Sequence, residues 1–499
     1  MALMTEKLRA TMAIEPDRAE IDFEGVDYSW RQIADTVRAI EDALGAMRLP
    51  QDTRVGVMLR NRPGHVAAIV AVLSTDRCLV TLNPILPDAK LFADVEGLGL
   101  PVVIADATDL ARPGLADALA RSGSAVIEVG GRLEGIRVLQ GEVRTEILTS
   151  PGVAIEMLTS GTTGTPKRVP LSRASFDASF RGFAKYERGR SFDDAPRLSS
   201  GVTLVINPLT HIGGIYGCIG ALAAGRKIGL LEKFSVEAWV DAVRRHRPAV
   251  ASAVPSAVRM LLDADVDPAD LSSLKSLISG TAPLAPDLVD AFYERYGIPI
   301  CSNYGATEFA GAVAGWTIDD FRAHWTAKRG AVGRVHSNIE ARIVDPGGGA
   351  ILGPGEEGLL EIKGRQLGND MQWLRTTDRA VLDEDGFLFI RGRADNAIIR
   401  GGFKVHPDDV VQVLNDHPAV REAAVVGVAD ERLGAVPAAA IILKDGADEP
   451  AVDSLKAWLK QRLIAYQVPV HIRIVPDFPR TPSMKPSAPG LRQLFEETG

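Results

Sequence analysis

The sequence predicts an α/β protein. A large N-terminal domain of doubly wound sheets continues into a β-rich portion, and a small α+β C-terminal domain follows. Three observations support this prediction. The chain has 499 residues, which is too long for one compact core. Short apolar runs alternate with helical stretches as far as residue 303, as in the βαβ units of a parallel sheet. Beyond residue 340 the pattern changes to paired strands.

The alternating region starts with residues 29–47, whose apolar side chains have helical spacing behind Ser29, a favourable N-cap. The later apolar runs are expected as strands, with helices between them that include 235–246 and 286–296. These strands are expected at 55–59, 78–82, 102–105, 125–129, 227–231, 250–254, 276–280 and 299–303.

Residues 198–225 carry no Lys, Arg, Asp or Glu, and a stretch of that length can span a bilayer. However, Asn207, Pro208, His211 and several glycines interrupt it. We therefore interpret the stretch as a strand, a turn and a glycine-rich core helix, and we expect no integral membrane segment.

Hairpin-type strands are expected between residues 341 and 390, with Asp385-Gly386 as one turn. A small α+β unit follows, and its first helix begins at Pro407. Its other elements are expected as strands at 423–428, 438–443 and 470–475 and a helix at 451–463, before a loop rich in Pro and Ser. We place the domain boundary at 393–396, which divides the chain into residues 1–393 and 394–499.

The composition is 46% hydrophobic and 24% charged, with a formal net charge of −8. An acidic chain without basic runs disfavours binding to nucleic acid or to anionic membranes. The three cysteines, Cys78, Cys218 and Cys301, lack metal-ligand spacing, so neither disulfides nor a zinc site are expected. The first residues contain no apolar signal core. These features together predict a cytoplasmic protein.

Residues 158–167, LTSGTTGTPK, directly follow an apolar run. Their hydroxyl groups and glycine-exposed backbone amides can surround phosphate oxygens, and a lysine adds positive charge. The spacing differs from that of the Walker loop, and a flexible polar turn is the alternative interpretation. The residues expected to bind phosphate are Thr159, Ser160, Gly161, Thr162, Thr163, Gly164 and Lys167.

This segment resembles the phosphate loop of the adenylate-forming superfamily of acyl-CoA synthetases, luciferases and peptide-synthetase adenylation domains. Two later segments, SGTAP at 279–283 and YGATE at 304–308, resemble other parts of that nucleotide site. Each follows a predicted strand, so both are expected at the carboxyl edge of the sheet, where α/β proteins bind ligands. Taken singly, each could be an ordinary strand-end turn.

The resemblance assigns a role to several of these residues. It implies that Tyr304 stacks on adenine, that Thr307 bonds a phosphate and that Glu308 holds Mg²⁺. The remaining residues expected around the adenine are Gly280, Thr281, Ala282, Pro283 and Asn303.

The resemblance continues toward the C-terminus. The sequence WLRTTD resembles the ribose segment, with Asp378 as the ribose ligand, although Thr377 stands where the family usually has glycine. The sequence GRAD resembles the hinge. There the resemblance implies that Arg393 contacts the ribose and that Asp395 absorbs the rotation of a mobile C-terminal domain. A surface aspartate in a turn is the alternative for Asp378.

Two further matches lie in the C-terminal domain. Gly401 and Gly402 resemble the loop that lines the thiol tunnel, where glycines leave room for a pantetheine arm. Lys485 aligns with the late catalytic lysine, and Met484 stands in place of the usual glycine before it. Methionine does not adopt a positive φ without cost. An ordinary tight turn and an exposed tail lysine are the alternatives.

The resemblance implies a two-step reaction that uses ATP, Mg²⁺ and coenzyme A. A carboxylate attacks the α-phosphate of ATP to give an acyl adenylate, and a CoA thiol then takes the acyl group. Two anions must meet in the first step, so charge screening is the main requirement. The magnesium held by Glu308, the phosphate loop and the Lys485 ammonium would provide it. The carboxylate needs positioning but no base.

Residues 207–214, NPLTHIGG, resemble the segment that gates the acyl pocket. His211 is expected near the substrate carboxylate, with an ordinary core histidine as the alternative. The segment offers no early aspartate to pair a substrate ammonium, which disfavours an α-amino acid. The pocket is expected at Ile212, Gly213 and Gly217. The lack of side-chain bulk there favours an aryl, alicyclic or medium-chain acid.

Three other functions stay open at this point. An acyl-AMP ligase would pass its product to a carrier protein instead of CoA. A luciferase-like oxygenase shares the fold. A degenerate synthetase without activity would remain a nucleotide-binding or partner-binding module, an interpretation supported only by Thr377 and Met484. In all cases the expected small-molecule ligands include ATP, and the sequence gives no indication of oligomeric state.

Overall fold

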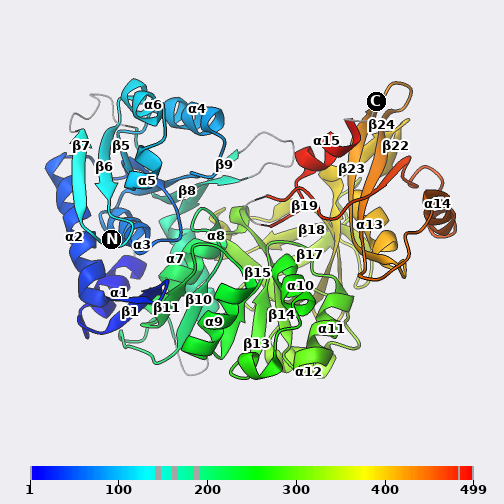
Figure 1. Cartoon of the computed structure of the whole chain (residues 1–499), viewed down its shortest axis with the longest axis horizontal. Helices are drawn as coiled ribbons and strands as arrows, with labels where there is room; N and C mark the ends of the chain where they lie inside the picture. The colour runs from blue at the N-terminus through cyan, green and yellow to red at the C-terminus, as the bar shows by residue number, and fades with distance from the viewer. Residues whose placement is uncertain (1–2, 141–147, 160–166, 185–190, 482–483, 497–499) are drawn as a thin grey trace. The chain divides into compact units, whose positions relative to one another are not determined.

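The structure is a computed structural model that describes residues 3–140, 148–159, 167–184, 191–481 and 484–496. The chain divides into two compact units, and Figure 1 labels helices and strands of both. Unit 1 comprises Met1–Ser160, Pro166–Ile339 and Lys363–Gln372, and unit 2 contains Glu340–Ile362 and Trp373–Gly499. The boundary at 393–396, where the C-terminal residues are predicted to turn, stays a prediction.

Unit 1 contains a seven-stranded sheet. Its strands are β3 (Arg54–Met58), β4 (Cys78–Leu82), β5 (Val102–Ala105), β6 (Ala125–Val129), β7 (Ile136–Gln140), β8 (Val153–Thr159) and β9 (Lys167–Ser172). They lie in the order β7-β6-β5-β3-β4-β8-β9. The strands from β6 to β8 pair in parallel, and the two edge strands are antiparallel. The chain adds β4 on one side of β3 and β5 on the other, which confirms the predicted doubly wound arrangement.

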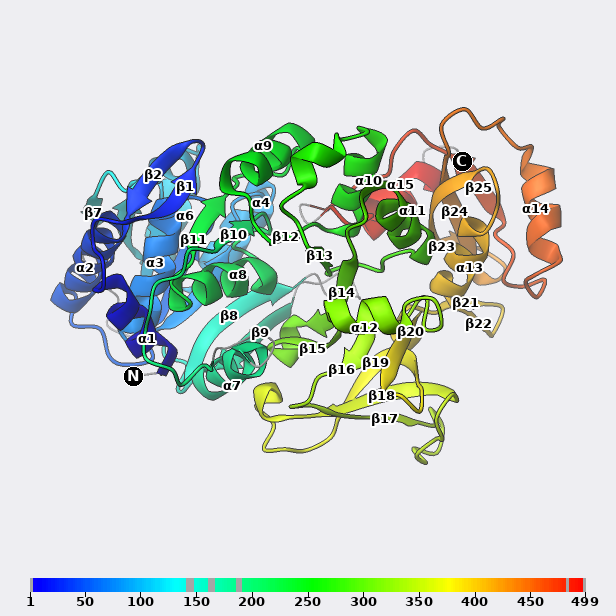
Figure 2. The same ribbon diagram turned by 90° about the horizontal axis from the view of Figure 1, so that it is seen from below.

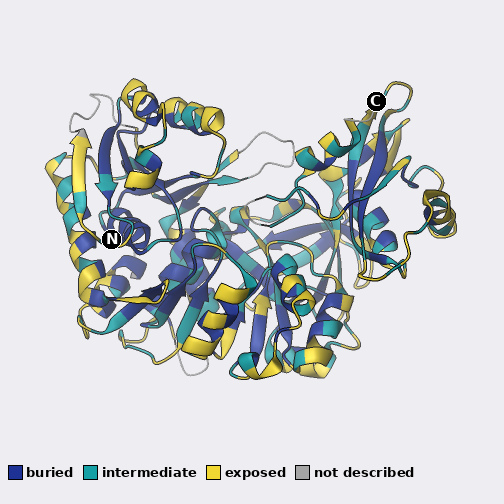
Figure 3. Ribbon diagram, in the orientation of Figure 1, coloured by how far each residue is buried: buried dark blue, intermediate teal, exposed yellow. Residues whose placement is uncertain are grey.

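Helices cover both faces of this sheet. They are α2 (Trp30–Ala46), α3 (Pro63–Ser74), α4 (Asp88–Leu98), α5 (Ala107–Leu110) and α6 (Leu115–Ser122). Helix α2 begins as predicted, because Ser29 and Gln32 exchange the two hydrogen bonds of a capping box. Helix α3 is buried along its whole length and joins the core on one face of the sheet. Helices α4 and α6 keep exposed outer faces (Figure 3).

A four-stranded sheet in the order β10-β11-β1-β2 also belongs to unit 1. Its strands are β1 (Ala19–Phe23), β2 (Val26–Ser29), β10 (Val202–Val205) and β11 (Lys227–Leu230). Helix α8 (Ile212–Ala223) connects β10 to β11, so the charge-free stretch folds as the predicted strand, turn and core helix. Helix α1 (Leu3–Met12) also packs in this core. Within the described ranges, no helix combines the length and apolar character needed to cross a membrane.

The remaining strands of unit 1 lie in the order β12-β13-β14-β15-β16. They are β12 (Val250–Ser252), β13 (Ser276–Ser279), β14 (Ile300–Ala306), β15 (Gly311–Gly315) and β16 (Gly333–Val335). The first three are parallel, which places the ends of β13 and β14 side by side, whereas β14 and β15 form an antiparallel pair. The accompanying helices are α7 (Arg173–Ala184), α9 (Val236–His246), α10 (Pro255–Asp263), α11 (Pro286–Tyr296) and α12 (Ile318–His324).

Unit 2 begins with the predicted paired strands, β17 (Glu340–Val344), β18 (Glu357–Lys363), β19 (Leu374–Leu382) and β20 (Phe387–Arg393). A second sheet has the order β22-β21-β24-β23, with β25 beside β24. Its strands are β21 (Ile398–Arg400), β22 (Phe403–Val405), β23 (Val420–Asp430), β24 (Gly434–Leu443) and β25 (His471–Ile474), with helices α13 (Pro407–Asn415), α14 (Val452–Lys460) and α15 (Ala488–Glu496). Helix α13 packs on this sheet through Val410 and Leu414 (Figure 2).

Candidate functional site

The base of the predicted phosphate loop is a two-stranded hairpin. Strands β8 and β9 pair antiparallel with Thr159 opposite Lys167, and the Thr159 hydroxyl donates to the Lys167 carbonyl at 3.1 Å. The Lys167 side chain is exposed, and its ammonium has no partner within the described ranges. A positive charge therefore lies at the loop end of the hairpin, where the predicted phosphate loop begins and ends. The other predicted phosphate ligands, Ser160–Gly164, lie outside the described residues.

The parallel strands β13 and β14 bring two predicted adenine-side segments together. A Cβ on Gly280 would lie 2.2 Å from the Asn303 Oδ1 atom, so only glycine leaves room for the amide. The next residue, Thr281, has φ +71°, a conformation that costs a threonine roughly 1–2 kcal/mol. Gly280, Thr281 and Asn303 all line one cavity, whereas Ala282 and Pro283 follow beyond it.

Strand β14 continues through Tyr304 to Ala306, further than predicted, and then a short 3₁₀ turn carries Thr307 and Glu308. The Tyr304 ring lies 6.0 Å from the Phe309 ring, centroid to centroid. Glu308 is exposed, and its carboxylate has no ion-pair or hydrogen-bond partner within the described part of the chain. A free carboxylate at a strand end fits the oxygen donors that Mg²⁺ prefers.

The cavity has a volume of about 220 Å³ and is lined by residues from the ends of β13, β14 and β15 and from helices α7 and α8. Ile212 and Gly213, two predicted acyl-pocket residues, are in its wall. The third, Gly217, lies one turn further along α8 and is not in the wall. His211 is the residue before α8 and is half-buried outside the lining. None of the described lining residues is charged.

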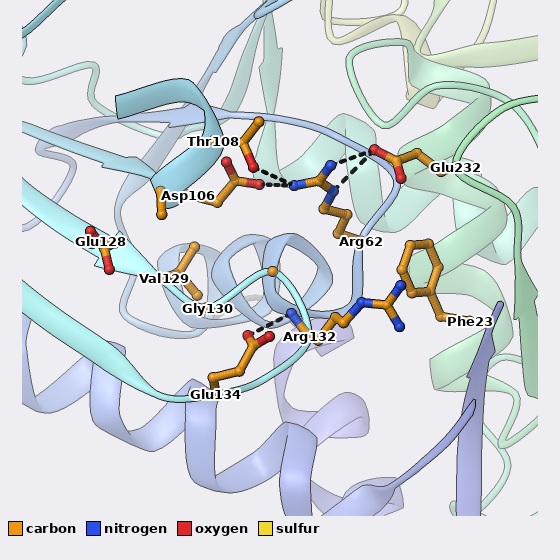
Figure 4. A pocket seen from close by; sticks show the side chains of 12 residues that line it. Phe23, Arg62, Asp106, Thr108, Glu128, Val129, Gly130, Arg132, Glu134 and Glu232 are labelled. Atoms are coloured by element: carbon orange, nitrogen blue, oxygen red, sulfur yellow. Dashed lines mark hydrogen bonds and ion pairs between the residues drawn. The ribbon is translucent and has the colours of Figure 1, made fainter. Parts of the chain in front are cut away.

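A second cavity of about 380 Å³ lies at the carboxyl ends of β5 and β6, beside the start of α3 (Figure 4). Its charged groups already satisfy one another. Arg62 pairs with Asp106 at 2.6 Å and with Glu232 at 2.8 Å, and the Arg132 guanidinium lies 5.0 Å from the Phe23 ring centroid.

The helix end beside that second cavity is also occupied. The Gly64 amide donates to the Gly131 carbonyl at 3.0 Å, and a Cβ on Gly64 would lie 2.1 Å from the Gly130 carbonyl oxygen. Backbone therefore fills the place at the start of α3 where a phosphate would otherwise bind. The smaller, uncharged cavity is the better candidate for a substrate site.

In unit 2, the predicted ribose and hinge residues contact each other. Strands β19 and β20 are antiparallel neighbours, and the backbone of Asp378 lies opposite that of Arg393. The Arg393 guanidinium donates to both oxygens of Asp395, at 2.9 and 2.8 Å, and to the Thr377 hydroxyl at 2.6 Å. Thr377 therefore contacts the same guanidinium that pairs with Asp395, a contact that the sequence pattern did not indicate.

Strand β20, which leads into the predicted hinge, also contacts the start of α13. A Cβ on Gly392 would lie 2.3 Å from a carboxylate oxygen of Asp408, and Gly392 has φ +102°. Burial raises the pKa of Asp408, although the Arg393 backbone amide donates to it and opposes the rise. Next to it, Arg379 pairs with Asp409 at 3.1 Å. Sequence reasoning missed both aspartates, whose only signal was their position just after Pro407.

The predicted thiol-tunnel glycines form the two-residue turn between β21 and β22. Gly401 and Gly402 have φ +55° and +87°, the pair of positive values that a type I′ hairpin turn requires. Beside the turn, Phe403 is 58% exposed and stacks on Tyr466 at 4.8 Å. The tip of this hairpin is thus narrow and free of bulky side chains at the two glycines.

Lys485 lies in a tight loop that ends in the tail. Met484 has φ +64°, so it adopts the left-handed conformation that the sequence analysis identified as costly. The Thr481 amide donates to the Lys485 carbonyl at 2.8 Å, and Arg480 donates to the Met484 carbonyl at 3.2 Å. Burial lowers the pKa of Lys485, and its ammonium has no partner among the residues described.

Known proteins resemble this chain along most of its length. A model of the AMP-binding enzyme family matches residues 8–369, and one of the AMP-binding enzyme C-terminal domain matches residues 410–485. 4-Coumarate–CoA ligase 3 of Oryza sativa subsp. japonica is 28% identical over 487 residues, which cover 92% of this chain and 86% of that protein. 2-Succinylbenzoate–CoA ligase of Bacillus cereus is 26% identical over 517 residues and is covered completely, as is this chain.

Solved structures show the same fold. Amide bond synthetase McbA from Marinactinospora thermotolerans superposes with a TM-score of 0.79 at 28% identity, covering 99% of this chain and 100% of that one. o-Succinylbenzoate CoA synthetase (MenE) from Bacillus subtilis, with an acyl-adenylate bound, gives a TM-score of 0.78 at 24% identity and 98% coverage of both chains. Because the family model spans most of its length, the chain belongs to the family of AMP-binding enzymes.

Proposed function

We propose that this enzyme is an ATP-dependent carboxylic acid–CoA ligase that forms an acyl adenylate and then a thioester. The observation that carries the proposal is the shared wall of the uncharged cavity. Gly280, Thr281 and Asn303 line the same space as Ile212 and Gly213. A nucleotide at the strand ends and an acyl group in the cavity would therefore lie next to each other. The names of the relatives from rice and Bacillus, both acid–CoA ligases, support the reaction class.

In the first step, a carboxylate oxygen bonds to the α-phosphorus of ATP and pyrophosphate leaves. Screening between two anions is the main requirement, and bound Mg²⁺ supplies part of it. Glu308, whose carboxylate is unpaired among the described residues, would hold that ion, and the exposed ammonium of Lys167 would approach the phosphates. Lys485 supplies a further cation. The remaining contribution is positioning, for which Tyr304 provides a ring for the adenine.

In the second step, the CoA thiol attacks the acyl carbon and AMP leaves. The narrow Gly401-Gly402 turn provides a slender surface for the pantetheine arm. The C-terminal residues turn about Asp395 between the two steps, so that Lys485 serves the first and the glycine turn serves the second. Arg393 contacts the ribose when its contact with Asp395 is released. Asp378 accepts hydrogen bonds from the ribose hydroxyls.

The cavity favours a compact acid with one carboxylate. Its volume of about 220 Å³ is below the roughly 300–1,000 Å³ typical of pockets for drug-sized ligands. A second carboxylate, such as 2-succinylbenzoate carries, would lie in a lining without a described cation, which is costly. An aryl or alicyclic monocarboxylic acid fits better than a medium-chain acid.

A second candidate replaces the thiol by an amine. The amide bond synthetase McbA is as similar in sequence as the rice CoA ligase. An acyl adenylate can be attacked by either nucleophile, so the two candidates share the first step. A carrier protein in place of CoA likewise stays a possible acceptor, and the cytoplasmic location stays a prediction.

The deciding experiment follows AMP release with a panel of aryl and alicyclic acids and ATP. Reactions contain CoA, a primary amine, or neither. The proposal expects pyrophosphate release that depends on the acid, and AMP release that CoA accelerates at least about tenfold over the amine. Faster AMP release with the amine would establish the second candidate instead. Failure of every acid to drive ATP–pyrophosphate exchange would refute both.

A further inference from the structure

Two neutral polar side chains lie at one end of the uncharged cavity. Asn207 follows strand β10, Ser252 ends strand β12, and both line the cavity. Neither the Asn207 carboxamide nor the Ser252 hydroxyl has a hydrogen-bond partner among the described residues. Both residues are half-buried, and their polar atoms remain accessible. This end of the cavity can therefore form hydrogen bonds that the fold itself does not use.

The order of the strands places these two groups away from the predicted nucleotide. Strands β14, β13 and β12 are parallel neighbours, and β10, the edge strand of the four-stranded sheet, lies beside β12. Asn303 and Gly280 line the cavity at β14 and β13, so Ser252 comes next along the row and Asn207 comes last. An acid whose carboxylate meets the nucleotide therefore extends its other end toward Asn207.

A buried asparagine holds the backbone at Asn207. Asn61 is 3% exposed and donates to the carbonyl of Asn207 at 3.1 Å and to that of Leu231 at 3.0 Å. Its side-chain oxygen accepts from the Leu209 amide at 2.9 Å. The Asn61 carboxamide is thus used within the fold, and it fixes the segment that carries the unused one. A hydrogen-bonding group on a fixed segment loses little freedom when a ligand binds.

Gly213 leaves the Asn207 carboxamide uncovered. A Cβ on Gly213 would lie 3.2 Å from Asn207 Nδ2, a tighter contact than side chains normally make. Both residues line the cavity, so a larger residue at position 213 would press against the carboxamide at the cavity wall. Glycine at this position therefore keeps Nδ2 open to a ligand in addition to reducing side-chain bulk.

The chemistry of this end of the cavity favours an uncharged partner. A carboxamide has both donors and an acceptor, and it does not ionise. None of the described lining residues is charged, so an ammonium or a second carboxylate would lose water without gaining a counter-ion. A hydroxyl or carbonyl oxygen, in contrast, can pair with the carboxamide at little cost.

We propose that Asn207 determines substrate specificity by binding a neutral oxygen substituent on the acyl body, at the end remote from the carboxylate. This inference rests on the proposed acid–CoA ligase function and narrows its substrate class. The preferred substrate is an aryl or alicyclic monocarboxylic acid with a hydroxyl or carbonyl oxygen at that end. An acid without the oxygen displaces water from the carboxamide and leaves it unpaired.

The experiment compares three acids of nearly equal shape. Benzoates and cyclohexanecarboxylates that carry an ethyl, a hydroxymethyl or an aminomethyl group at ring position 3 or 4 present a methyl, a hydroxyl or an ammonium in the same place. The full-length enzyme is assayed for kcat/KM by acid-dependent pyrophosphate release. In at least one series we expect the hydroxymethyl acid to be preferred about tenfold or more over each of the other two, because a site that bonds a hydroxyl discriminates against its absence.

Substitutions of Asn207 should change this order in two different ways. Asn207→Leu removes the hydrogen-bonding groups, so the hydroxymethyl and ethyl acids should differ by less than about threefold. Asn207→Asp keeps the shape and adds a negative charge, so kcat/KM for the aminomethyl acid should rise at least about tenfold relative to the ethyl acid. A gain of turnover cannot come from an enzyme that fails to fold.

The matched control is Asn83→Asp, which adds the same charge outside the cavity lining. The Asn83 side-chain oxygen accepts from the Ile85 amide at 3.0 Å, a bond that aspartate can keep. This variant should retain the wild-type order of the three acids. A rise for the aminomethyl acid in Asn83→Asp as large as in Asn207→Asp would show a general effect of charge and would overturn the inference.

The remaining outcomes separate this inference from the proposed function. Equal turnover of the ethyl and hydroxymethyl acids by the wild-type enzyme would overturn the inference and leave the ligase function intact. The same holds if only unsubstituted acids are used. Equal losses for both acids in Asn207→Leu, without a gain for the aminomethyl acid in Asn207→Asp, would show a packing role instead. If no acid drives pyrophosphate release, the proposed function fails, and the inference fails with it.

Discussion

The Arg393 guanidinium forms a bidentate ion pair with the Asp395 carboxylate, with N···O distances of 2.9 and 2.8 Å. These residues are proposed to serve different purposes, Arg393 as a ribose ligand and Asp395 as the hinge. A guanidinium that faces Asp395 with two of its nitrogens cannot offer the same geometry to a ribose. Nucleotide binding and the freedom of the hinge are therefore expected to be coupled through one side chain.

Thr377 should weaken ATP binding by holding Arg393 on the hinge. Its hydroxyl accepts a hydrogen bond from Arg393 at 2.6 Å. Thr377→Val keeps the β-branched shape but removes the acceptor, so releasing Arg393 costs less. We expect the KM for ATP in ATP–pyrophosphate exchange to fall about two- to fivefold, in line with the modest net value of an exposed hydrogen bond. Thr377→Ser, which keeps the hydroxyl, is the control, and a higher KM in Thr377→Val would contradict the coupling.

Gly280→Ala should damage the adenylation half-reaction. The new Cβ would lie 2.2 Å from Asn303 Oδ1, so the amide must leave its position on the cavity wall. We expect kcat/KM for pyrophosphate exchange to fall by about 10- to 100-fold, as misplacement of a positioning group does. The control is Gly97→Ala in helix α4, where a Cβ meets nothing within 4 Å. Equal activity of the two variants would remove Gly280 from the site.

Local patterns in the sequence predicted the alternating strands and helices, because an apolar run and the turn residues on either side of it are enough to predict a single strand or helix. They also placed the strand-end segments at one sheet edge, and β13 and β14 indeed end side by side. The N-terminal hairpin was missed. Its place in the sheet depends on the pairing of Ile21 with Ile228. The spacing of apolar residues within one element cannot predict a contact between residues so far apart in the chain.

The polar contacts of the site were less predictable still. The resemblance identified Arg393 and Asp395 separately, but only the register of β19 and β20 shows that Thr377 joins them.

Lys485→Ala should separate the two half-reactions. The ammonium is proposed to screen the meeting of carboxylate and phosphate, and the thiol step needs no such cation. We expect adenylate formation to fall by about 10²–10³-fold, the usual cost of losing one stabilising group. Thioester formation from supplied acyl adenylate should change less than about threefold. Parallel loss of both half-reactions would refute this division of labour.

The pH profile of adenylation should report the titration of Lys485. Burial lowers its pKa from the ordinary 10.5, so the charged form is present below the lowered pKa and is lost as pH rises through it. The rate of pyrophosphate exchange should therefore decline on the alkaline side at a lower pH than a free lysine would give. Lys485→Arg keeps its charge throughout this range. Its residual rate should show no such decline, and a decline at the same pH would assign the titration to another group.

Asp408→Asn should stabilise unit 2 at neutral pH. Burial raises the pKa of Asp408 above its ordinary value of 3.8. The unfolded chain ionises this carboxyl more readily, so its charge opposes folding at neutral pH. That opposition starts to decrease as the pH falls below the raised folded pKa and is gone only below the ordinary value of 3.8. Asparagine is neutral, and its side-chain oxygen can still accept from the Arg393 amide, so the variant should unfold roughly 1–3 °C higher at pH 7.

The same difference should shrink as the pH falls below the raised pKa and should vanish below pH 3.8, because wild-type Asp408 then becomes neutral as well. Asp409→Asn is the matched control. Asp409 pairs with Arg379 at 3.1 Å, so removing its charge should lower Tm at pH 7 or leave it unchanged. Differential scanning calorimetry at pH 7 and at pH 3.5 measures the change in Tm of both variants relative to wild type. A stability gain for Asp408→Asn that is as large at pH 3.5 as at pH 7 would show that its origin is not the buried charge.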